Sequence, residues 1–154
     1  MINMDRDKIA TVFGVGFIGR YLIRELTKRG YRCIIPTRSS FQKGYLKTQA
    51  PPGAIEFIDW KQGDLSKIKE SIANSDIVIN LIGILYENRK QKFSKIHAEI
   101  PNVISKLCSQ SEVKKFIHIS AIGANENSKS KYQKSKYQGE VKALNNFKNT
   151  VIVR

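Results

Sequence analysis

A glycine-rich turn constrains this chain more than any other feature. Gly14-Val15-Gly16-Phe17-Ile18-Gly19 lies between a short apolar segment, Lys8 to Phe13, and a segment that ends at Gly30. The apolar segment is typical of a strand. The segment after it has apolar residues at the spacing of one helix face: Ile18, Tyr21, Leu22 and Leu26. Gly30 is the kind of residue that ends a helix.

The G-x-G-x-x-G spacing between a strand and a helix has a physical reason. The first glycine permits a tight turn, and the second lets backbone N–H groups approach a pyrophosphate at the positive end of the helix. The third permits close packing of the helix on the strand. The spacing therefore favours dinucleotide binding, with an ordinary tight turn as the alternative.

Strand-like and helical segments continue to alternate along the chain. Further strands are expected at 32–35, 55–58, 76–82, 116–120 and 150–153, and helices at 64–73, 93–108 and 131–145. Residues 39–54 form a loop with at most a short helix, Pro36 closes the second strand, and Pro101 kinks or breaks a helix. This pattern predicts one α/β domain over 1–154, with an open, doubly wound parallel sheet.

Composition narrows the class of protein. The 154 residues are 41% hydrophobic, which is too apolar for a disordered chain. Cys33 and Cys108 are the only cysteines, too few for a disulfide framework or a four-cysteine metal site. We expect two buried free thiols, no metal site and a reducing compartment. No stretch approaches the ~20 apolar residues that span a bilayer, and no targeting segment is evident, so a cytoplasmic or matrix-like location is expected.

The chain is strongly basic. Lys and Arg number 27 against 13 Asp and Glu, a formal charge of +14. Many of the lysines crowd the last fifth of the chain, but no recognised nucleic-acid motif accompanies them. A solvated basic face is therefore favoured, while nucleic acid or an anionic membrane surface stays open as a partner.

The residues after the second strand bear on cofactor choice. An acid there would hydrogen-bond the ribose 2′-OH of NAD, but the sequence reads Pro36-Thr37-Arg38-Ser39-Ser40. Arg38 could hold a 2′-phosphate instead, which favours NADP(H) over NAD(H); the alternative is an exposed loop arginine. After the third strand, Asp64 suits a helix N-cap, and it could also contact adenine.

Tyr132 and Lys136 share one helix face because they are four residues apart. An ammonium group beside a phenol favours the phenolate, so this Tyr could act as a general acid or base in hydride transfer. Ser120, at the end of the preceding strand, could orient a carbonyl oxygen.

Taken together, these motifs resemble the extended and atypical short-chain dehydrogenase/reductases, the NAD-dependent epimerase/dehydratase family. They occur in the family order over nearly the whole chain: the glycine turn, Gly63-Asp64-Leu65, Asn80-Leu81-Ile82-Gly83, Phe116 to Ala121, and Tyr132-x-x-x-Lys136. The run Ser120-Ala121-Ile122-Gly123-Ala124-Asn125 is most similar to the branch that contains the NADPH-binding accessory subunit of respiratory complex I and its bacterial relatives.

The resemblance implies a Rossmann fold with NAD(P) over the carboxyl ends of the strands. Tyr132 would be the acid/base, Ser120 its helper, and Lys136 would touch the nicotinamide ribose. The other residues implied at the cofactor are Gly14, Gly16, Phe17, Ile18 and Gly19 at the pyrophosphate, Arg38 and Asp64 at the adenosine, and Leu81, Ile82 and Gly83 along the cofactor.

Two departures from the family pattern carry expectations. The glycine turn is one residue shorter than the family's G-x-x-G-x-x-G, so the turn must tighten or the strand must slip. Family members also continue past the sixth strand into a substrate-binding portion, so this sequence corresponds to their N-terminal half and is truncated after that strand.

The sequence is compatible with several functions. The first is an NAD(P)-binding protein of the complex I accessory type, in which the cofactor is structural. The second is an oxidoreductase or epimerase completed by a separately encoded C-terminal half. A truncated remnant without function and a basic binding module are the others. The resemblance favours a bacterial cytoplasmic protein, peripheral to the inner membrane if a respiratory complex is its partner.

Overall fold

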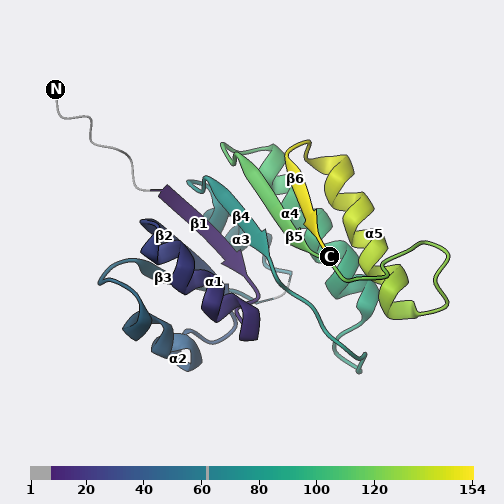
Figure 1. The fold of residues 1–154 in the computed structure, drawn as a ribbon, viewed down its shortest axis with the longest axis horizontal. Coiled ribbons are helices and arrows are strands. Elements are labelled where there is room, and N and C mark those ends of the chain that lie inside the picture. Colours follow the sequence, from purple (N-terminus) through teal and green to yellow (C-terminus); the bar gives the residue numbers. More distant parts are fainter. Residues whose placement is uncertain (1–7, 62) are drawn as a thin grey trace.

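A six-stranded parallel sheet forms the centre of the molecule (Figure 1). The computed structural model describes residues 8–61 and 63–154. The strands lie in the order β3-β2-β1-β4-β5-β6, so the order reverses at β1. Their bounds are β1 Lys8–Phe13, β2 Tyr31–Thr37, β3 Ile55–Asp59, β4 Ile77–Asn80, β5 Lys115–Ile119 and β6 Thr150–Val153. The expected fold class is confirmed, and each strand end lies within two residues of its predicted position.

Helices cover both faces of the sheet and follow the predicted order. They are α1 Phe17–Lys28, α2 Ser40–Lys43, the 3₁₀ helix η1 Gly44–Gln49, α3 Leu65–Ile72, the π-helix η2 Ser94–Glu99, α4 Ile100–Ser109 and α5 Lys131–Asn146. The expected helix over 93–108 changes from π to α geometry beside Pro101. The proline then occupies the first turn of α4, where its missing N–H is not needed.

Two hydrophobic cores form because side chains alternate across the strands. Phe13, Val78 and Phe116 point to one face and pack under α3, η2, α4 and α5 in what we call the α4-side core. Val12 and Ile35 point to the other face and pack under α1 and η1 in the α1-side core. β4 contributes to both cores, as expected for a strand buried on both faces.

Two local expectations differ from the structure. Pro36 does not close β2, which runs on to Thr37 through pairing with β3. The paired positions with β1 end at Ile34, so the missing N–H of Pro36 is not required by that ladder. The packed face of α1 also differs from the apolar spacing: Ile18 and Tyr21 are exposed, and Ile23 is buried instead.

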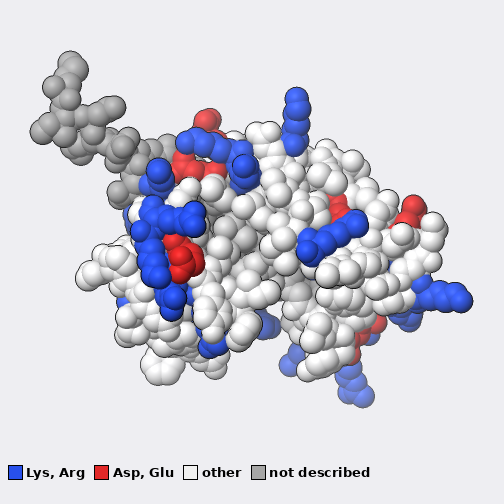
Figure 2. Space-filling model, in the orientation of Figure 1, with Lys and Arg blue, Asp and Glu red and all other residues white. Residues whose placement is uncertain are grey.

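Charged side chains are spread over the surface. On the face that Figure 2 shows, Lys and Arg stand in several separate places, some of them beside Asp or Glu, and few lie over the middle. This distribution fits a solvated basic surface better than a single basic groove on that face. Within the described part of the chain, no helix has the length and apolar character needed to cross a bilayer.

Candidate functional site

A cleft opens at the carboxyl ends of β1, β2 and β4, beside the strand at which the sheet order reverses. This is the position at which open parallel sheets bind ligands. Its volume is about 350 Å³. Six of the predicted cofactor residues line it: Gly14, Gly16, Arg38, Leu81, Ile82 and Gly83. The cleft also includes Lys43 and Trp60, which the sequence did not single out.

Gly14 is required by the fold itself. Its φ is +83°, and an added Cβ would lie 2.6 Å from the backbone N of Ile82. The N–H of Leu81 donates to the carbonyl of Phe13 at 2.8 Å, so the turn and the loop after β4 run in close contact. A side chain at Gly14 would therefore force these two segments apart.

Gly16 has a different status. A Cβ built there meets no atom within 4 Å, so no neighbouring group excludes a side chain at this position. Its N–H donates to the carbonyl of Gly14 at 2.9 Å, which closes a three-residue turn. The short glycine segment is thus accommodated by a tighter turn, while β1 keeps its predicted bounds.

Gly19 lies where α1 packs on the sheet. A Cβ at this position would be 3.3 Å from side-chain carbons of Leu81 and Val15. Phe17 and Ile18 begin the helix with exposed side chains, outside the lining of the cleft. The first turn of α1 contains no acid, so nothing there neutralises the positive end of the helix dipole.

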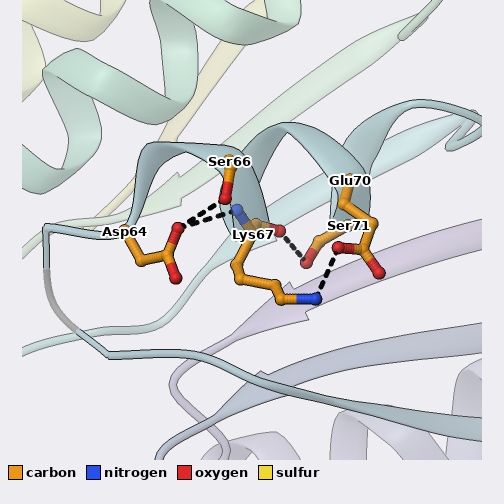
Figure 3. Close-up of polar contacts among 5 residues, drawn as sticks. All are labelled: Asp64, Ser66, Lys67, Glu70 and Ser71. Carbon is orange, nitrogen blue, oxygen red and sulfur yellow. Dashed lines mark hydrogen bonds and ion pairs between the residues drawn. The ribbon is translucent and has the colours of Figure 1, made fainter.

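Asp64 caps α3 (Figure 3). Its Oδ1 accepts hydrogen bonds from the Ser66 hydroxyl at 2.7 Å and from the Lys67 N–H at 3.1 Å. These bonds, led by that from Ser66, lower the pKa of the carboxyl. The N-cap prediction is confirmed. Asp64 does not line the cleft, so a contact with adenine stays a prediction.

The residues implied in proton transfer gather around the end of β5, beyond the lining of the cleft. Lys136 is 3% exposed, and its Nζ donates to the carbonyl of Ile119 at 2.8 Å. Burial lowers the pKa of Lys136 to about 8, against an opposing effect of Glu140. The hydroxyl of Ser120 is buried, and none of the described residues bonds to it. Tyr132 is partly buried with its ring against His97.

His97 links the two parts of the site, although the sequence analysis did not select it. On η2, its Nε2 accepts the N–H of Ile84 at 3.0 Å, and its Nδ1 lies 2.9 Å from the Ser135 hydroxyl. A backbone N–H can only donate, so Nε2 is unprotonated and the proton of the neutral ring is on Nδ1. His97 therefore ties the loop after β4 to the helix that carries Tyr132 and Lys136. The one available signal is its place beside Ile96 on a buried helical face.

Asn80 and His118 form a second buried link. Asn80 Nδ2 is 3.1 Å from His118 Nδ1, and Asn80 Oδ1 accepts the N–H of Ile82 at 3.1 Å. The side chain at the end of β4 thus fixes the backbone of the loop that lines the cleft. In residues 8–61 and 63–154, no group of three or more His, Cys, Asp or Glu is placed to hold a metal ion.

Comparison with known proteins identifies relatives. The profile of the NAD dependent epimerase/dehydratase family matches residues 10–146. NADH dehydrogenase (ubiquinone) 1 alpha subcomplex subunit 9 of Mus musculus is 34% identical over 148 residues, 95% of this chain and 39% of the mouse protein. The NADH-ubiquinone oxidoreductase 40 kDa subunit of Neurospora crassa is 34% identical over 146 residues, 94% of this chain and 39% of that subunit. The chain spans about two fifths of the length of these relatives.

Solved structures share the fold. A Bacillus halodurans protein described as an NAD-dependent epimerase/dehydratase has a TM-score of 0.81 at 19% identity, over 96% of this chain and 69% of that one. UDP-glucuronic acid 4-epimerase from Bacillus cereus, solved in complex with NAD, has a TM-score of 0.74 at 21% identity, over 95% of this chain and 56% of the epimerase. With a family match over most of its length, this chain belongs to the NAD-dependent epimerase/dehydratase family.

Proposed function

We propose that this chain is an NAD(P)(H)-binding Rossmann domain whose dinucleotide lies in the cleft, with its pyrophosphate over Gly16. The observation that carries the proposal is the contrast between the glycines. Gly14 is needed by the fold, whereas Gly16 has open space around it and faces the cleft at the start of α1. A glycine with open space on its side-chain side, at a helix N-terminus without a side-chain cap, suits close approach of a pyrophosphate.

NADP(H) is favoured over NAD(H) by charge. Arg38 and Lys43 both line the β2 side of the cleft, and the residues that follow β2 include no acid for a ribose 2′-hydroxyl. Two cations beside Thr37 suit a 2′-phosphate, which carries extra negative charge and oxygen acceptors.

The role that we favour is that of an accessory-type cofactor-binding protein. Its support is the 34% identity to relatives named as subunits of NADH dehydrogenase. On this proposal its partner is a respiratory assembly, and its place is on the cytoplasmic or matrix surface of the membrane that carries the assembly.

A second candidate is the cofactor half of an oxidoreductase or epimerase, completed by a further polypeptide. Three side chains favour it, namely Ser120, Tyr132 and Lys136 at the end of β5. A bound nicotinamide would supply the hydride chemistry. Tyr132 would give or take the proton at the substrate oxygen. The Ser120 hydroxyl, which bonds to none of the described residues, would orient that oxygen.

Thermal unfolding with and without NADPH tests the binding proposal, with NADH as the comparison. A ligand at 100 times its dissociation constant adds about 2.7 kcal/mol to the free energy of unfolding. We expect a rise of several degrees in the midpoint for the natural chain. In Gly16→Ala this rise should disappear, while the variant without ligand still unfolds in one cooperative transition.

Gly44→Ala is the matched control, because Gly44 also has open space around it and lies outside the cleft. It should respond to NADPH like the natural chain. A cooperative transition that neither dinucleotide shifts would rule out the cofactor assignment. An equal response in Gly16→Ala would rule out the placement of the pyrophosphate.

A further inference from the structure

Trp60 directly follows β3, on the same side of the sheet reversal as Arg38. The backbone N–H of Trp60 donates to the carbonyl of Thr37 at 2.8 Å, and this bond holds Trp60 against the end of β2. Its ring meets Phe13 edge-on, with centroids 6.0 Å apart. The side chain is only 7% exposed, yet it lines the cleft with Arg38 and Lys43. Trp60 thus forms part of the wall on the β2–β3 side.

The indole N–H of Trp60 has no acceptor among the described residues, although the nitrogen is buried. Indole nitrogen only donates, and a buried donor without a partner is costly. Buried tryptophans usually find an acceptor for this group. Because Trp60 is a lining residue of the cleft, a ligand bound there is a source of the missing acceptor.

The position of Trp60 in the cleft indicates which half of a bound dinucleotide would supply that acceptor. A pyrophosphate over Gly16 lies at β1, where the sheet order reverses. The half of the ligand toward β2 and β3 then meets Arg38, Lys43 and Trp60, and the other half meets β4 and β5. Because the two cations are the groups that suit a 2′-phosphate, the β2–β3 half is the adenosine.

We propose that Trp60 anchors the adenosine half of the cofactor, its indole N–H donating to an acceptor atom of that half. This inference rests on the proposed dinucleotide binding and adds the residue that recognises one end of the ligand. Adenine ring nitrogens and ribose oxygens are acceptors of the required kind.

Trp60 is the only tryptophan of the chain, so tryptophan emission reports on this site alone. We expect AMP and 2′,5′-ADP to change the emission of the natural chain, and nicotinamide mononucleotide to leave it unchanged. Trp60→Phe keeps a ring against Phe13 and removes the donor. Calorimetry should show a roughly five- to tenfold loss of affinity for NADPH and 2′,5′-ADP in this variant.

Tyr45→Phe is the control, since it removes one polar group from an aromatic ring outside the cleft and should bind NADPH like the natural chain. If calorimetry shows no binding of NADPH or NADH to the natural chain, the proposed function fails. If NADPH binds but AMP and 2′,5′-ADP leave the emission unchanged, or Trp60→Phe binds as well as the natural chain, the assignment of Trp60 alone is wrong. If Trp60→Phe does not fold, the response of Trp60 emission in the natural chain to AMP and 2′,5′-ADP decides whether the assignment of Trp60 is right.

Discussion

Lys136 is an ammonium group enclosed by protein, and it donates a hydrogen bond to the backbone carbonyl of Ile119. Burial places its pKa near 8, below the value of about 10.4 for an unfolded lysine. Between these values the unfolded chain binds the proton more readily than the folded chain does. The free energy of unfolding therefore includes a penalty from Lys136 at pH 7, and this penalty is lost as the pH rises from about 8 to about 10.4.

Lys136→Met should remove this pH dependence. We expect the natural chain to gain stability relative to the variant between pH 8 and about 10.4, by up to about 1.4 kcal/mol per pH unit. Urea unfolding of both chains at several pH values measures the difference. Parallel curves for the two chains over this range would contradict the expectation.

The two histidines of the chain make its stability depend on pH in the acidic range. Burial, with the Lys136 charge second, lowers the pKa of His97 to about 4 and of His118 to about 3. Below about pH 6.5 both histidines become protonated in the unfolded chain, while they stay neutral in the folded chain. Stability should therefore fall as the pH decreases from about 6.5 to about 3.

His97→Gln measures how much His97 contributes to this loss of stability, because glutamine can accept the hydrogen bond from the Ile84 N–H and does not titrate. Its urea-unfolding midpoint should fall less steeply than that of the natural chain between pH 6.5 and 4. Equal slopes would mean that His97 is protonated in the folded chain or that its pKa is unshifted.

Arg38 is expected to choose between the two dinucleotides. Arg38→Ala should weaken NADPH binding by about ten- to a hundredfold, the range for hydrogen bonds to charged groups, and leave NADH binding nearly unchanged. Calorimetry with both ligands measures this, and Arg29→Ala, an exposed arginine just after α1, serves as the control. An equal loss for both ligands would show that Arg38 does not read the 2′-phosphate.

The helices α5 and η2 pack closely against each other at Gly139. A Cβ at Gly139 would lie 1.9 Å from the carbonyl oxygen of His97, so only glycine allows the two helices to meet. Because η2 carries His97 and α5 carries Tyr132 and Lys136, this contact sets the geometry of both halves of the site.

Gly139→Ala should lower the free energy of unfolding by roughly 3 kcal/mol or more, because the overlap is with backbone rather than with a movable side chain. Gly44→Ala adds the same methyl group in open space and should change stability by less than about 1 kcal/mol. Chemical denaturation compares the two. A neutral Gly139→Ala would show that the helices can separate at little cost.

At the scale of the whole molecule, the sheet joins two cores that each hold one cysteine. Cys108 belongs to the α4-side core and Cys33 to the α1-side core. Both thiols are buried as predicted, and burial raises the pKa of each to about 12. Neither thiol should react while the sheet is intact.

We expect both thiols to become reactive at the same urea concentration, because β1 and β4 contribute to both cores and the chain should unfold as one unit. Pulsed alkylation with site identification by mass spectrometry, beside Trp60 emission, tests this. Reaction of Cys33 well before Cys108 would instead show two units that open separately.

The sequence by itself determined the elements and their order. Short apolar segments, alternating with segments of helical spacing, predicted all six strands. Local chemistry predicted the N-cap at Asp64 and the turn at Gly14, because caps and turns depend on neighbours a few residues away.

Only the tertiary structure decided which residues meet across the fold. It exposed Ile18 and Tyr21, carried β2 through Pro36, placed Trp60 in the wall of the cleft, and joined Ile84 to Ser135 through His97. It also placed Ser120, Tyr132 and Lys136 around the end of β5, next to the cleft but outside its lining. The physical reason is that burial and hydrogen bonding depend on partners distant in sequence, which periodicity and local propensity do not encode.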